Sequence, residues 1–235
     1  LNKLEPSEEL TARIEALQVD ITYADAVALY GQGKFEEASD LLVTIFDDPR
    51  AKALLDVIKV RAELMAKTQE ADRLFSAGEW VAAQGAYEAV ALESPSSRVL
   101  ARINSCRFEL ALIEGDDALD QAVAELADAP TQSQAALAAA RGSFQTASQI
   151  DSTRQIRDIE PRILEISRLE RIADAFIKGD ELLKQKEWKL AESNFTAALE
   201  SCQTVGETNM VQSRIDMADY GKYMDSGIRD FRVGQ

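Results

Sequence analysis

The fold class of this chain is decided by a six-residue string that recurs along it. The four copies are Gly33-Lys34-Phe35-Glu36-Glu37-Ala38, Gly78-Glu79-Trp80-Val81-Ala82-Ala83, Gly142-Ser143-Phe144-Gln145-Thr146-Ala147 and Lys186-Glu187-Trp188-Lys189-Leu190-Ala191. Each copy has Gly or Lys first, an aromatic residue third and Ala last. Gly can adopt the left-handed conformation that ends a helix, the aromatic ring can pack under the turn, and Ala lets a second helix approach closely. The string therefore predicts pairs of helices joined by short turns.

A weaker fifth copy and the prolines complete this pattern. Residues 117–122 keep the final Ala but have Leu119 in place of the aromatic residue. When the weaker copy is included and the copies are counted in chain order, each of the first four is followed by one proline. Pro favours the first turn of a helix. These prolines are Pro49, Pro95, Pro130 and Pro161. Since no segment shows the β-branched alternation typical of a strand, the sequence predicts an all-α protein.

The recurring positions resemble those of the tetratricopeptide repeat family. A small residue in the first helix of three units is followed by the turn residue, the aromatic residue and the Ala. In chain order these are Ala26, Gly33, Phe35 and Ala38; Ala71, Gly78, Trp80 and Ala83; and Gly179, Lys186, Trp188 and Ala191. The resemblance implies an α-solenoid of antiparallel helix pairs, with about 10–11 helices, some of the first helices being elongated. It covers most of residues 20–205 and is weakest around Asp117 and Gly142.

The repeat length departs from the family's 34 residues. The final Ala residues of successive strings are 45, 39, 25 and 44 residues apart. We expect one helical-repeat domain over residues 1–235. Its units are 7–48, 50–94, 96–129, 131–160 and 162–204, with a C-terminal helix at 207–231. A non-repeating helical bundle, or two lobes that meet near residue 130, remains an alternative.

Composition excludes several function classes. The 41 Asp and Glu against 26 Lys and Arg give a net charge of −15, which argues against nucleic-acid binding. The chain has no His and two Cys, and it shows no Gly-rich phosphate loop. The acidic pairs Asp47-Asp48 and Asp116-Asp117 are interpreted as turns and helix starts. We therefore expect no enzyme activity, no cofactor, no metal site and no direct membrane insertion.

The family resemblance implies a concave groove formed by the first helix of each unit. The positions that it assigns to this groove are Tyr23, Val27 and Tyr30; Thr68, Asp72 and Phe75; and Phe176, Asp180 and Leu183. The Asn that some family members use to grip a carboxylate is absent, because the chain has Val27, Asp72 and Asp180 there. The groove is expected to be apolar with acidic spots, and to suit a protein or peptide with apolar anchors and some basic charge.

The functional hypothesis is a non-enzymatic protein–protein interaction scaffold. The alternative is a regulatory or recruiting domain excised from a larger enzyme or a membrane-anchored protein, and self-association through the terminal helices is a further one. The chain starts at Leu1 with no initiator Met, which suggests a piece of something longer. We expect a soluble chain, leaning cytoplasmic, with the soluble domain of a membrane-anchored or cell-envelope protein as the alternative.

Overall fold

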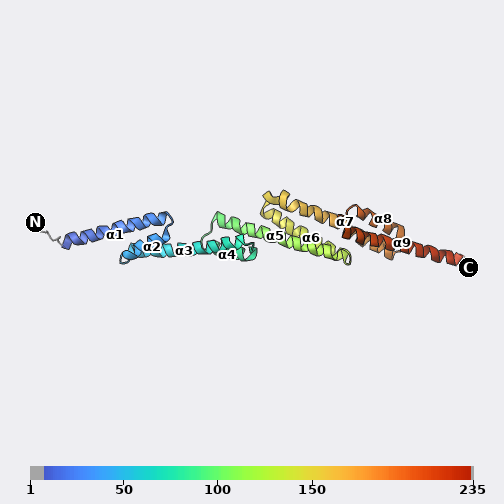
Figure 1. The fold of residues 1–235 in the computed structure, drawn as a ribbon, viewed down its shortest axis with the longest axis horizontal. Coiled ribbons are helices and arrows are strands. Elements are labelled where there is room, and N and C mark those ends of the chain that lie inside the picture. Colours follow the sequence, from blue (N-terminus) through green and yellow to red (C-terminus); the bar gives the residue numbers. More distant parts are fainter. Residues whose placement is uncertain (1–7, 234–235) are drawn as a thin grey trace. The chain divides into compact units, whose positions relative to one another are not determined.

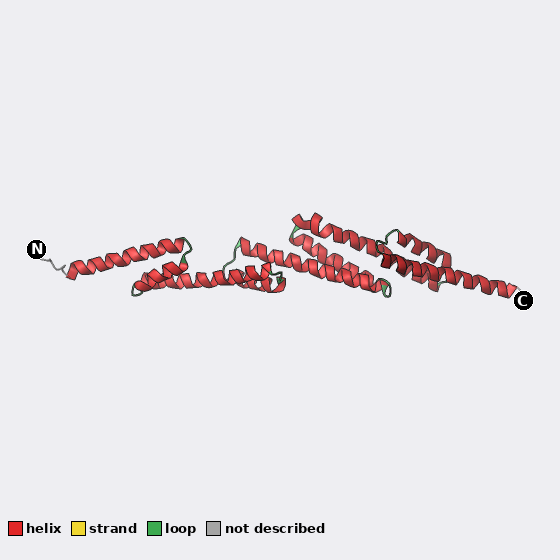
Figure 2. Ribbon diagram, in the orientation of Figure 1, coloured by secondary structure: helices red, strands yellow, loops and turns green. Residues whose placement is uncertain are grey.

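The computed structural model describes the backbone of residues 8–233 and the side-chain surroundings of residues 8–227. Within the described residues the chain forms nine α-helices and no strand, so the all-α prediction is confirmed (Figures 1 and 2). The helices are α1 Glu8–Gly31, α2 Phe35–Thr44, α3 Pro49–Ser76, α4 Trp80–Glu93, α5 Ser97–Glu125, α6 Pro130–Ile150, α7 Glu160–Lys184, α8 Trp188–Leu199 and α9 Val205–Val233. The chain divides into two compact units, Leu1–Leu100 and Ala101–Gln235, which are described separately.

The first unit is built from two helix pairs joined by left-handed glycines. Gly33 (φ +78°) lies between α1 and α2, and Gly78 (φ +76°) lies between α3 and α4, as the recurring string predicts. Asp48 caps α3 by accepting a hydrogen bond from the Arg50 backbone N–H at 2.7 Å, and Pro49 is the first residue of that helix. The core of α1, α2 and the start of α3 is made of Ala26, Ala38, Leu42, Ala51 and Ile58.

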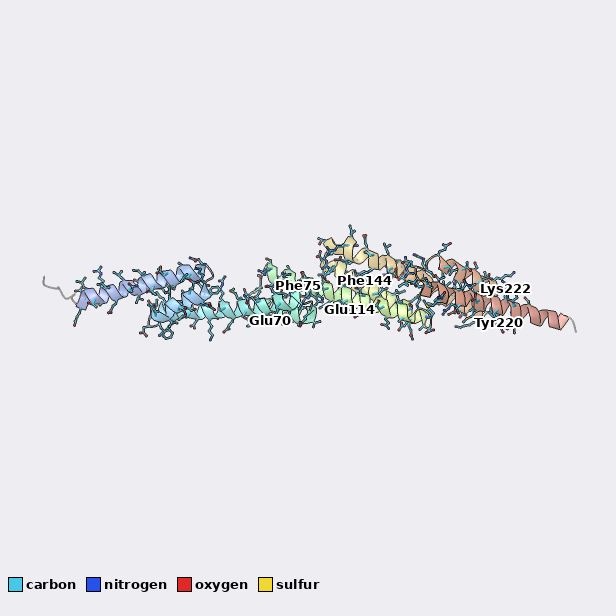
Figure 3. All side chains as sticks on the ribbon, in the orientation of Figure 1. Glu70, Phe75, Glu114, Phe144, Tyr220 and Lys222 are labelled. Carbon is cyan, nitrogen blue, oxygen red and sulfur yellow. The ribbon has the colours of Figure 1, made fainter. Side chains whose placement is uncertain are left out.

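The second unit has a single hydrophobic core that α6, α7, α8 and α9 share with α5. Lys186, between α7 and α8, adopts a left-handed conformation at φ +62°, where the first unit has glycines. Gly115 of α5 and Phe144 of α6 (labelled in Figure 3) are in close contact, because a Cβ on Gly115 would overlap the Phe144 ring. Gly179 of α7 lies in the same way beneath Phe195 of α8. Helix pairs in this unit therefore approach closely wherever a glycine faces an aromatic ring.

The predicted turns in the middle of the chain are wrong. Gly115 and Asp116-Asp117 lie inside α5, and Gly142 lies inside α6. Gly115 serves close packing, and Gly142 has no left-handed conformation and open space where a Cβ would stand. Each of these two regions is one long helix instead of a pair, which is why nine helices rather than 10–11 are described. A 3₁₀ turn at Ser152–Arg154 and a π turn at Gln155–Ile159 then lead into α7.

A buried ion pair joins α7 to the start of α9. The Arg168 guanidinium donates to both carboxylate oxygens of Glu207 at 2.8 and 2.9 Å, and to the Ser201 carbonyl at 2.9 Å. Glu207 also completes a capping box, because its side chain accepts from the Thr204 N–H and Thr204 Oγ1 accepts from the Glu207 N–H. The pair thus fixes the position at which α9 begins against α7.

This arrangement predicts an acid-sensitive second unit. Burial alone would raise the pKa of Glu207, but the hydrogen bonds from Arg168 and from the backbone of Gln203 and Thr204 lower it below its ordinary value. A carboxyl with a lowered pKa stabilises the fold above its ordinary pKa of about 4.3, and this stability is lost as the pH falls through the folded-state value. We expect the urea midpoint of the second unit to fall more steeply below pH 4.3 in the natural chain than in Glu207→Gln. Fluorescence of Trp188 in a Trp80→Phe background measures it, and parallel pH profiles would contradict the prediction.

Candidate functional site

A groove of about 860 Å³ opens on the first unit along the middle of α3. Its lining comes from the end of α1, from α3, from the end of α4 and from the residues that follow α4. The lining residues are Tyr30, Asp56, Val57, Val60, Arg61, Leu64, Met65, Thr68, Gln69, Asp72, Glu93, Ser94 and Arg98. All of them belong to the unit that ends at Leu100.

The groove exists because α3 is longer than the helices that cover it. With 28 residues α3 extends about 42 Å, whereas α2 has 10 residues and α4 has 14. Helix α2 packs against α3 near Ile58, and α4 packs against the part that holds Ala71. No residue of α3 between Ile58 and Ala71 is buried. The middle of this helix is therefore left as an accessible surface.

The floor of the groove is apolar. Val57, Val60 and Leu64 follow one another at helical spacing on α3, and the Val60 side chain is 63% exposed. Tyr30 of α1 forms one wall, where its hydroxyl accepts a hydrogen bond from Arg61 Nη1 at 3.2 Å. The Arg61 guanidinium also lies 5.8 Å from the Tyr30 ring centroid. The arrangement offers a partner an apolar strip with a fixed aromatic edge.

The charges of the groove are largely paired within the unit. Arg98 forms an ion pair with Asp72 at 3.3 Å, and the Tyr87 hydroxyl donates to the same carboxylate. Lys67 pairs with Glu93 at the same end of the groove. Asp56, at the other end, has no ion pair or side-chain hydrogen bond among the described residues. The acidic spot that remains open to a basic partner is therefore Asp56, which the family positions did not point to.

The groove positions predicted in the first unit are only partly brought together. Tyr30, Thr68 and Asp72 line the groove. Phe75 (labelled in Figure 3) does not line it, because its ring packs edge-on against Trp80 at 5.1 Å and against Tyr87 at 6.3 Å. Tyr23 packs on the core under the Arg50 guanidinium, 4.9 Å from its ring centroid, and Val27 is exposed on α1 outside the groove.

Of the groove positions predicted in the second unit, Phe176 and Asp180 are in contact with α9. Phe176 is 0% exposed and packs against Phe195, so its assignment to a groove was wrong. Arg214 of α9 lies 3.9 Å from the Phe176 ring centroid and pairs with Asp180 at 3.1 Å. Leu183 is half-buried against the same core. Helix α9 occupies the surface that the family resemblance leaves for a partner.

Acidic and thiol side chains also occur outside the groove, in the described part of the chain. No cluster of three or more His, Cys, Asp or Glu side chains able to hold a metal ion occurs there. Burial raises the pKa of the Cys106 thiol and of the Cys202 thiol, which disfavours the reactive thiolate. None of the described helices combines the length and the apolar character needed to cross a membrane.

Comparisons with known proteins give no further assignment. No protein-family model, no curated protein and no solved structure matches this chain. The groove along α3 is therefore the candidate functional site on the strength of its own geometry and charge.

Proposed function

We propose that this protein is a non-enzymatic interaction scaffold of the tetratricopeptide-repeat type, and that the groove along α3 binds a segment of a partner protein. The observation that carries the proposal is the accessible apolar strip of Val57, Val60 and Leu64 in the middle of a helix whose two ends are packed. Contiguous exposed apolar surface with a polar rim is typical of protein-binding sites.

Local geometry supports the repeat type. Gly33, Gly78 and Lys186 take left-handed conformations at the three turns where the family has its helix-ending residue. The small residues Ala26, Ala71 and Gly179 are all buried, as the family's close helix packing requires. An α-solenoid built from such pairs leaves its first helices on a binding face, and α1 and α3 supply most of the lining of this groove.

The partner segment is proposed to carry apolar anchors and at least one Lys or Arg. The anchors would cover the strip on α3, and the cation would pair with the Asp56 carboxylate. The strip supplies most of the affinity, because a few desolvated contacts dominate interface energies. Asp56 chiefly sets the association rate and its salt dependence, since exposed charges act mainly by steering.

Selection of peptides from a displayed library against the whole chain tests this function. Selected peptides are expected to combine aliphatic or aromatic residues with Lys or Arg. Their affinity, measured by fluorescence anisotropy, should fall at least about 30-fold for Val57→Ser/Val60→Ser, the scale of a hot spot of about 2 kcal/mol.

A matched control separates the groove from general surface apolarity. Val43 of α2 is 61% exposed and lies outside the groove, so Val43→Ser should leave the affinity unchanged. Asp56→Asn should slow association at low salt and leave the dissociation rate nearly unaltered. Peptides that bind the Val57→Ser/Val60→Ser variant as tightly as the natural chain would place binding elsewhere and refute the proposal.

A further inference from the structure

The first half of α1 carries an exposed apolar seam at heptad spacing. Leu10, Ile14, Leu17 and Ile21 are 54–59% exposed and follow one another at intervals of four, three and four residues. Every residue from Glu8 to Gln18 is exposed, and α1 extends past α2 and the start of α3 in this region (Figure 1). The interval pattern is that of a coiled coil, in which the a and d residues of one helix face another helix.

The seam lies on the face of α1 that is opposite the core of the first unit. Ala26 is fully buried, and Leu17 precedes it by nine residues, which is two and a half helical turns. Ala24 and Ala28 continue the seam and are also exposed. A helix that docked on the seam would therefore leave the packing of α1 on α2 and α3 untouched.

We propose that the seam pairs with the same seam of a second copy of this chain, as a short antiparallel two-helix coiled coil. The seam has Ile14 and Ile21 at its a positions and Leu10 and Leu17 at its d positions, so a second copy supplies an aliphatic residue opposite each of them. The surface is separate from the α3 groove, so the dimer does not depend on the proposed function.

The charges beside the seam set the orientation. In the antiparallel register, Ile14 faces Leu17 of the second copy and Leu10 faces its Ile21, so all four layers are apolar. This register brings Arg13 beside Asp20 of the second copy, twice by symmetry, and both residues are exposed g positions. Asp20 already forms an ion pair with Arg50 of its own chain at 2.7 Å, and Arg13 of the second copy would join that pair. A parallel register would instead place Asp20 beside Asp25 of the second copy, again twice. Opposite charges support the antiparallel pair and like charges oppose the parallel one.

The antiparallel register is also compatible with the remainder of the first unit. The overlap runs from Glu8 to Tyr23 in both copies, about 24 Å of helix. Tyr23, which packs on the core of the first unit, lies at the end of this overlap, and the core residues from Ala26 onward lie beyond it. Since only two heptads pair, we expect a reversible dimer whose fraction rises over protein concentrations from about 1 µM to about 1 mM.

Sedimentation velocity of the whole chain over that range tests the proposal. The natural chain is expected to shift from the mass of one chain to that of two. Ile14→Asp/Leu17→Asp should weaken the dimer at least about 100-fold, because it buries unpaired charges in the two central layers. The matched control is Leu92→Asp on α4, an exposed leucine outside the seam, which should dimerise like the natural chain. Circular dichroism of each variant should show unchanged helix content.

Charge variants test the orientation independently of the apolar seam. Arg13→Asp faces Asp20 in the antiparallel dimer and should weaken it about 10-fold, whereas Arg13→Lys, which keeps the positive charge, should dimerise like the natural chain. In a parallel dimer Arg13 would face Gln18, and Arg13→Asp would change little.

Three outcomes would overturn the proposal. One is a natural chain that stays monomeric throughout the range, which would leave the seam to a different protein. Another is a dimer that survives Ile14→Asp/Leu17→Asp. The third is open-ended growth that Tyr220→Ser/Tyr223→Ser on α9 abolishes, since Tyr220 (labelled in Figure 3) and Tyr223 are also exposed.

Discussion

Replacing Arg168 with Met is expected to lower the unfolding free energy of the second unit by about 3–5 kcal/mol. Arg168 and Glu207 are both buried, and the guanidinium that pairs with Glu207 also donates to the Ser201 carbonyl and to the Glu165 carboxylate. Removal of the guanidinium leaves the Glu207 carboxylate buried without its counter-ion. The loss of one partner of a buried pair is far more costly than the loss of an exposed one.

Urea unfolding followed by Trp188 fluorescence in a Trp80→Phe background measures this effect in the second unit. The matched control is Arg157→Met, because Arg157 pairs with Asp158 while its side chain is 75% exposed. That variant should cost no more than about 1 kcal/mol. Equal midpoints for Arg168→Met and Arg157→Met would mean that the pair between α7 and α9 does not hold these helices together.

The turns of the three regular helix pairs were predictable from sequence, and those in the middle were not. Gly33, Gly78 and Lys186 each stand two residues before an aromatic residue in the sequence. Each of them adopts the left-handed conformation at a turn in the structure, so the local sequence signal coincides with the observed turn. Gly142 begins the same string, yet it lies inside α6. A glycine suits a helix end and also a helix interior, and the choice depends on packing that the string does not contain.

The candidate site was predictable only where it depends on local position. Tyr30 and Asp72 line the groove, and each lies shortly before a turn that the recurring string predicts, at Gly33 and at Gly78. Phe176 was misassigned because Arg214, which covers its ring, lies on α9 and comes 38 residues later in the sequence. Val57 and Val60 were missed, although the length of α3 relative to α2 and α4 could have indicated an uncovered middle. The heptad spacing of the apolar residues from Leu10 to Ile21 could also have been recognised from the sequence.

The contact of Phe195 with Gly179 carries the second large prediction. Phe195 is fully buried, its ring packs edge-on against Phe176 at 6.3 Å, and a Cβ on Gly179 would overlap it. Phe195→Ala is expected to lower the unfolding free energy of the second unit by about 3–5 kcal/mol, the usual cost of emptying a buried aromatic site. The Trp188 fluorescence assay measures it, and a loss below about 1 kcal/mol would mean that the ring is dispensable for packing α8 on α7.

Glycine variants then distinguish close packing from simple burial. Gly179→Ala should cost about 1–3 kcal/mol, since the added methyl group displaces the Phe195 ring. Gly142→Ala, at a helical glycine with open space around it, should instead stabilise the unit by about 0.5–1 kcal/mol. In a Phe195→Leu background, where the smaller side chain makes room, Gly179→Ala should cost little. Such non-additivity is expected only of residues in direct contact. If Gly179→Ala costs the same in both backgrounds, the glycine does not set the distance between α7 and α8.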